Sequence, residues 1–162
     1  MAIRIIFIIV FIFDMNIANA IEFTDVESSI RSKGAKATLG ELSWPYEKWN
    51  AFIEKVESGD PRWVALTIEL RSASDAGASF ELDHSLAHAY SQNPESFSEP
   101  LNPDQLCNPN YMELSTKPEA EAYLLRMRKI IRELPDSEFK DQCNSLVVRY
   151  GKWVSEWDGT PP

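Results

Sequence analysis

The sequence has few of the residues that common catalytic motifs require. Its six glycines form no glycine-rich phosphate-binding loop, and no GxSxG segment presents a nucleophilic serine. Its two cysteines are far apart and lack the CxxC spacing of a zinc site. Carboxylates are plentiful, but the sequence singles out no pair of the kind that glycosidases use. The sequence therefore favours a protein without catalytic activity or cofactor. The alternative is a cell-wall-directed hydrolase that uses unidentified carboxylates.

No segment of the sequence carries a dominant positive charge. The net charge is −9, and residues 75–121 contain nine acids against a single base, Lys117. Nucleic acids are poor partners for such a chain, because binding to phosphates depends on basic surfaces. An acidic segment instead suits a protein partner with a basic surface.

No apolar run reaches the roughly 20 residues that a membrane span needs. The longest run covers residues 5–13; it follows Arg4 and precedes small residues that end at Ala20. This pattern predicts a Sec-type signal peptide over residues 1–20, cleaved after Ala20. Ile21 stands where a lipid-anchored protein would have cysteine. The mature chain is therefore expected in the periplasm or secreted, without a membrane span.

Both cysteines, Cys107 and Cys143, lie in the mature part of the chain. Export brings them into an oxidising compartment, where a disulfide between them is expected. Cys107 belongs to a proline-rich connection, residues 93–115, and the bridge would tie this connection to the last helix. Closing a loop of this span stabilises a fold by roughly 4 kcal/mol in the chain-entropy model.

Apolar residues recur with helical spacing and without sustained alternation, which predicts an all-α domain over residues 21–158. In the second expected helix, one apolar stripe contains Tyr46, Trp49 and Phe52. Asp25, Thr116 and Asp136 are predicted helix caps, Thr116 as part of a capping box. About six helices are expected, packed as an irregular bundle or a short solenoid, with a frayed tail at residues 159–162. The expected helices cover residues 25–42, 45–58, 61–70, 75–92, 116–134 and 136–157.

The two histidines, His84 and His88, are four residues apart on one expected helix. This spacing occurs in the HExxH zinc motif, but Ser85 stands where that motif has glutamate. On a helical wheel Glu81, His84 and His88 lie opposite the apolar side of the helix. The histidines are therefore predicted to be solvent-exposed, and no metal site is expected. The alternative is a weak divalent-metal site completed by Glu81.

Residues 34–97 resemble a group of exported proteobacterial proteins that share three short motifs. The motifs are GDPxW at residues 59–63, SDAGAS at residues 74–79, and NPE at residues 93–95. The resemblance implies a periplasmic all-helical domain and transfers no catalytic residues. The motif residues themselves are typical of helix caps and turns.

The leading functional hypothesis is a periplasmic protein-binding module, such as an inhibitor, an immunity-type protein or an envelope adaptor. A structural envelope protein is a further alternative. The expected binding face is acidic and draws on one helix and the connection that follows it. Its predicted residues are Glu81, Asp83, Glu95, Glu99 and Asp104.

Overall fold

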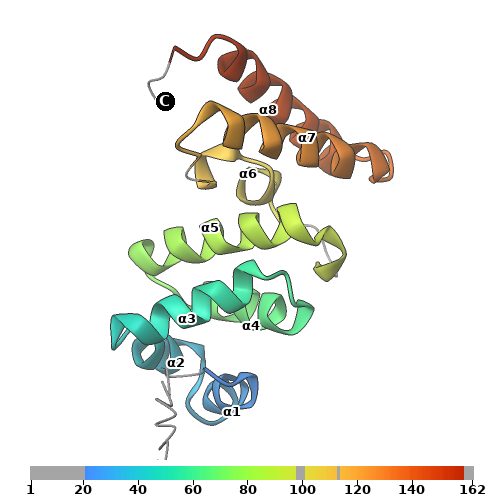
Figure 1. The fold of residues 1–162 in the computed structure, drawn as a ribbon. Coiled ribbons are helices and arrows are strands. Elements are labelled where there is room, and N and C mark those ends of the chain that lie inside the picture. Colours follow the sequence, from blue (N-terminus) through green and yellow to red (C-terminus); the bar gives the residue numbers. More distant parts are fainter. Residues whose placement is uncertain (1–20, 98–100, 113, 159–162) are drawn as a thin grey trace, which may run out of the picture.

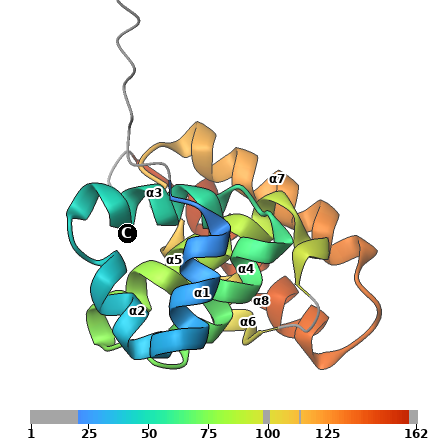
Figure 2. The ribbon, with the colours of Figure 1, turned by 90° about the horizontal axis from the view of Figure 1, so that it is seen from below.

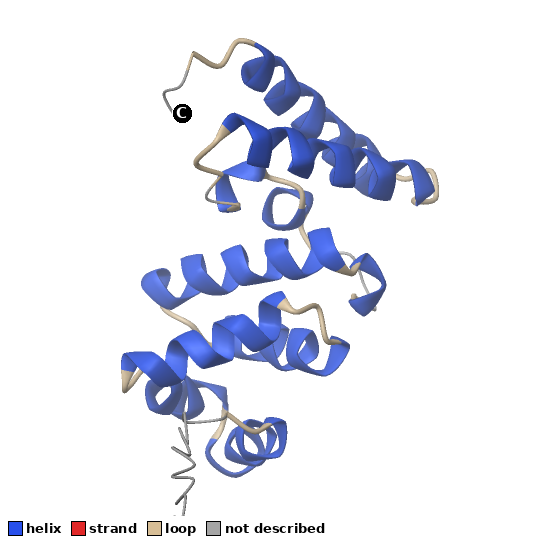
Figure 3. Ribbon diagram, viewed as in Figure 1, coloured by secondary structure: helices blue, strands red, loops and turns tan. Residues whose placement is uncertain are grey.

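The computed structural model describes residues 21–97, 101–112 and 114–158, and every regular element within these ranges is helical (Figures 1 and 3). The all-α prediction is confirmed. The predicted signal peptide (residues 1–20) and tail (residues 159–162) lie outside the described residues. The elements are α1 (Phe23–Lys33), α2 (Ala35–Leu42), α3 (Tyr46–Glu57), α4 (Pro61–Arg71), α5 (Ala76–Gln92), η1 (Pro94–Ser96), α6 (Pro103–Leu106), η2 (Pro109–Tyr111), α7 (Lys117–Glu133) and α8 (Glu138–Ser155).

The helices form a stack of layers that begins with α1 and α2 and ends with α7 and α8 (Figure 1). Figure 2 looks onto the α1–α2 end of this stack. Helices α3 and α5 pack against each other and run in the same direction, because Trp49 contacts Glu81 and Glu57 lies near His84. Helix α4 connects them. Within the described ranges, no helix combines the length and apolar character that crossing a membrane requires.

The described residues contain eight α-helices, where about six were predicted. One difference arises at Gly34, which ends α1 and precedes α2. Its φ of 84° and ψ of 161° belong to a region that side chains with a Cβ rarely enter. The count also includes α6, a single turn within the long connection, which Asn102 caps through the N–H of Asp104.

One of the three predicted helix caps is confirmed. Thr116 forms the expected capping box with Glu119 at the start of α7. The predictions for Asp25 and Asp136 are wrong, because α1 begins after Glu22 and α8 after Ser137. Asp136 instead accepts a hydrogen bond of 2.9 Å from the Lys140 ammonium.

Helix α5 is the central element of the stack. It packs against α3 and α4 on one side and against α6 and α7 on the other. Polar residues of this helix are therefore buried along with apolar ones, among them Asp83, Ser85 and Ser91. A continuous core of buried side chains extends from Ile21 to Val154.

The predicted disulfide between Cys107 and Cys143 is confirmed. Both residues are fully buried, and their Cα atoms are 5.2 Å apart. The bridge joins the connection after α6 to the second turn of α8. The Tyr123 hydroxyl of α7 donates a hydrogen bond of 3.2 Å to the Cys107 carbonyl. This bond links α7 to the same connection that the disulfide ties to α8.

Residues of the GDPxW and NPE motifs meet in space. Gly59 has a φ of 73° and approaches α5 so closely that a Cβ on it would lie 2.9 Å from the Asn93 Cβ. The Asn93 amide and the Ser96 hydroxyl both donate to the Gly59 carbonyl. Asp60 caps α4 through the N–H of Arg62 at 2.9 Å. These motif residues therefore hold the α3–α4 turn against the end of α5.

Candidate functional site

A groove of about 550 Å³ lies between α2, the first turns of α3 and the start of α5. Its volume is within the range of sites that bind small ligands or anchoring side chains. Its lining residues come from α2 and the turn after it, α3, the α4–α5 turn and α5. They are Lys36, Leu39, Gly40, Ser43, Tyr46, Trp49, Ala73, Ser74, Asp75, Gly77, Ala78 and Glu81.

Exposed aromatic side chains mark the turn that leads into this groove. Tyr46, which lines the groove, is 63% exposed, and Trp44, two residues earlier, is 79% exposed. The predicted apolar stripe placed Tyr46 in the core with Trp49 and Phe52. Trp49 and Phe52 are buried as expected, but Tyr46 belongs to the first turn of α3 and lies at the surface.

The charged groups of the groove are two carboxylates and one ammonium, those of Asp75, Glu81 and Lys36. The Trp49 indole N–H donates a hydrogen bond to a Glu81 carboxylate oxygen, which fixes Glu81 against α3. Asp75 caps α5 by accepting from the Ala78 N–H at 3.0 Å. Both carboxylates are thus held in place by the helices that form the groove walls.

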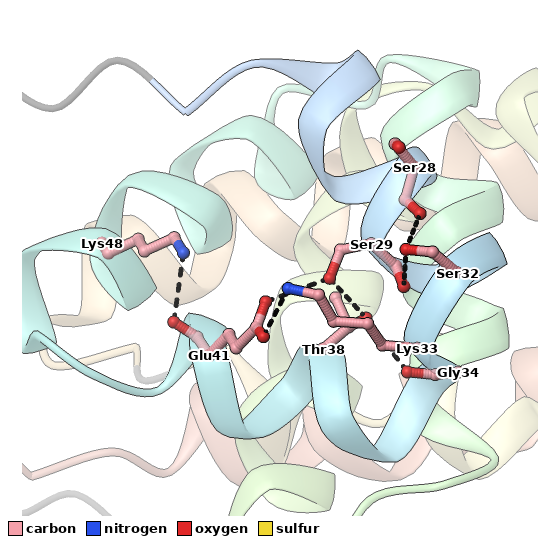
Figure 4. A network of polar contacts seen from close by, with 8 residues as sticks. All are labelled: Ser28, Ser29, Ser32, Lys33, Gly34, Thr38, Glu41 and Lys48. Atoms are coloured by element: carbon pink, nitrogen blue, oxygen red, sulfur yellow. Dashed lines mark hydrogen bonds and ion pairs between the residues drawn. The ribbon is translucent and has the colours of Figure 1, made fainter.

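A second cavity, of about 500 Å³, is lined by both polar and apolar residues from Ile21 through α1 and α2 to the start of α3. Figure 4 shows the polar network that includes several of these residues. Glu41 accepts from the Lys33 ammonium at 2.6 Å and from the Ser29 hydroxyl at 3.1 Å. These two donors hold the pKa of the Glu41 carboxyl below its ordinary value. A general acid at neutral pH needs a raised pKa, so Glu41 is unsuited to that role.

The predicted acidic face needs a correction at Asp83. This residue is 5% exposed, and its carboxylate accepts from the Arg71 guanidinium at 2.7 and 2.9 Å. The Gln105 amide of α6 donates to it as well, at 3.1 Å. Because α5 is covered on both sides, Asp83 lies inside the stack and contributes no exposed charge.

Two other residues of the predicted acidic face, Glu81 and Glu95, are separated by much of the length of α5. Glu81 belongs to the first half of α5, whereas Glu95 follows the end of that helix. At 1.5 Å per residue, roughly 20 Å of helix separates them. Asp104 is exposed on α6, and Glu99 lies outside the described residues. Glu81 is the one member of the predicted face that lines the groove.

The prediction of a solvent-exposed histidine pair is wrong. The side chain of His84 is 17% exposed, its Nε2 atom is buried, and His88 is also partly buried. The pair faces α3, where Glu57 lies 4.0 Å from His84. A helical wheel of one segment identifies its less apolar side but cannot show that a neighbouring helix covers that side.

Comparison of the chain with family models, curated proteins and solved structures found no match.

Proposed function

We propose that the protein is a periplasmic protein-binding module, which holds a basic segment of its partner in the groove between α2, α3 and α5. The observation that supports this proposal is that one groove of about 550 Å³ is lined by both an anchored carboxylate, Glu81, and an exposed aromatic side chain, Tyr46. Tyrosine and tryptophan are enriched among the residues that dominate binding energy at protein interfaces.

Charge supports a basic occupant. The chain has a net charge of −9, and acids outnumber bases among the groove residues. A negative protein attracts positively charged partners over several ångströms and discriminates against acidic ones. Two Lys or Arg side chains of the partner would pair with Asp75 and Glu81, while an apolar or aromatic residue packs on Tyr46.

The predicted signal peptide supports the periplasmic location, and the disulfide suits an oxidising compartment. An inhibitor, an immunity-type protein and an envelope adaptor all need a rigid surface of this kind. The experiments below therefore aim to identify both the partner and the residues that it contacts.

The first experiment is a pull-down from native periplasmic extract with the tagged protein, read by mass spectrometry after washes at low and high salt. We expect a basic partner that is retained at low salt and lost at high salt, because exposed charges are screened beyond about 10 Å at 0.1 M. The dissociation constant of the purified pair is then measured by calorimetry. We expect Tyr46→Ala and Glu81→Gln each to weaken binding about tenfold or more.

Glu47→Gln is the matched control, because Glu47 is exposed on the same turn of α3 but does not line the groove. It should bind like the unmodified protein. A partner that binds Tyr46→Ala and Glu81→Gln with full affinity would place the binding surface elsewhere and contradict the groove proposal. Salt-insensitive binding would contradict the basic occupant.

A further inference from the structure

A group of metal-ligating side chains lies outside the groove, where the last turn of α3 meets the middle of α5. Glu57 comes from α3, and His84 and His88 come from successive turns of α5. One ligand atom from each residue lies within 4.8 Å of the others. We propose that Glu57, His84 and His88 form a binding site for a divalent transition-metal ion, with Zn²⁺ as the best match.

The geometry of the site requires a small closure. The His84 Nδ1 atom lies 4.0 Å from a Glu57 oxygen, and the two imidazole centroids are 4.8 Å apart with planes at 68°. Tetrahedral zinc with bonds of about 2.0–2.2 Å holds its ligand atoms roughly 3.3–3.6 Å apart. The three ligand atoms therefore need to approach by up to about 1.5 Å, within the reach of side-chain rotation alone.

The donor set distinguishes among metals. Two imidazole nitrogens and one carboxylate oxygen are ligands that Zn²⁺, Cu²⁺ and Ni²⁺ accept. Mg²⁺ and Ca²⁺ prefer sites made of oxygen atoms. Zinc sites with three protein ligands of this kind keep a fourth position for water or another ligand. Glu57 is 31% exposed, which leaves the site accessible to solvent on one side.

The packing of α5 makes the site partly preformed. Glu81, His84 and His88 share the side of α5 that faces α3, and the Trp49–Glu81 hydrogen bond holds the two helices in register. The backbone positions of all three ligands are thus set by the fold. A bound ion would join α3 to α5, the two helices that also line the groove. The metal proposal does not depend on the proposed function, and the two are tested separately.

The test is calorimetric titration of the purified protein with ZnCl₂, after treatment with a chelator and with a tag that contains no histidine. We expect one zinc ion per chain and a higher thermal unfolding midpoint in the presence of zinc, because a ligand that binds the folded state stabilises it. His84→Ala, His88→Ala and Glu57→Gln should each weaken zinc binding at least about tenfold. Mg²⁺ should give no binding.

Two control variants identify the third ligand. Glu54→Gln changes an exposed carboxylate one turn earlier on α3, and Glu81→Gln removes the carboxylate that the sequence offered as the third ligand. Both should bind zinc like the unmodified protein. Absence of zinc binding, or unchanged binding by the histidine variants, would overturn the proposal. Loss of affinity in Glu81→Gln but not in Glu57→Gln would overturn the ligand set.

A measurement on the unmodified protein covers the case in which a variant fails to fold. The chain has two histidines, so its imidazole proton resonances are few and assignable. Zinc should shift the resonances of both histidines together, and a chelator should reverse the shift. Unshifted histidine resonances at saturating zinc would overturn the site.

Discussion

Both sides of α5 carry polar residues, but different kinds of contact cover the two sides. On the α6 side, Asp83 accepts from Gln105 of α6 and pairs with Arg71, which reaches it from the end of α4. The nearby Cys107–Cys143 bridge fixes α6 to α8. On the α3 side, the contacts include the Trp49–Glu81 hydrogen bond and the cluster of Glu57 with the two histidines. The α6 side is held by a charge pair and a disulfide, whereas the α3 side borders the groove and solvent.

This difference distinguishes polar residues that are satisfied within the fold from those that are exposed and able to bind a partner. A buried carboxylate whose charge is matched by a guanidinium is satisfied within the fold and has little capacity to bind a partner. Asp83 raises the pKa of the Arg71 guanidinium above its ordinary value, as expected for such a pair. Glu81, by contrast, is exposed and lies at a groove wall. We therefore expect mutations on the α6 side to affect stability most, and those on the α3 side to affect binding most.

The largest expected effect is that of the disulfide. The double variant Cys107→Ser/Cys143→Ser should lose roughly 4 kcal/mol of unfolding free energy in the chain-entropy model, measured by urea denaturation. Hydrogen exchange should accelerate in residues 101–112 while α3 keeps its protection. Reduced unmodified protein is the control and should behave like the variant. Equal acceleration on both sides of α5 would contradict the distinction between them.

The next largest effect is expected at Asp83. Asp83→Asn removes the charge that matches Arg71, whose side chain is 33% exposed and thus partly solvated. We expect a loss of about 2 kcal/mol, below the 3–5 kcal/mol typical of a fully buried pair. Asp104→Asn is the matched control on the neighbouring helix, and should change stability by less than about 0.5 kcal/mol because Asp104 is exposed. Similar losses for the two variants would show that the Arg71 pair contributes little.

The sequence predicts those features of the fold that depend on local chemistry. The all-α class, the capping box at Thr116 and the disulfide all follow from residue types and spacings, and the structure confirms them. The break at Gly34 was not predicted, because a glycine within a helical pattern can equally be tolerated there.

The candidate sites depend on contacts between helices, which the sequence pattern does not reveal. Arg71 and Asp83 belong to different helices, as do Glu57 and His84. The helical wheel of α5 groups Glu81, His84 and His88 on its less apolar side, yet α3 packs against that side. The exposure of Tyr46 likewise follows from its position in the first turn of α3 and cannot be read from its spacing to Trp49.

The smallest expected effect concerns the α3 side. Glu81→Ala removes the acceptor of the Trp49 indole N–H, and we expect a loss of about 1 kcal/mol, the typical net contribution of one hydrogen bond. Glu81→Gln is the matched control, because its amide oxygen can still accept from Trp49; it should stay within about 0.5 kcal/mol of the unmodified protein. Urea denaturation followed by tryptophan fluorescence measures both. The glutamine variant keeps the hydrogen bond but loses the charge, so a weakening of partner binding in this variant would be electrostatic in origin. A large loss of stability in the same variant would instead assign Glu81 a structural role like that of Asp83.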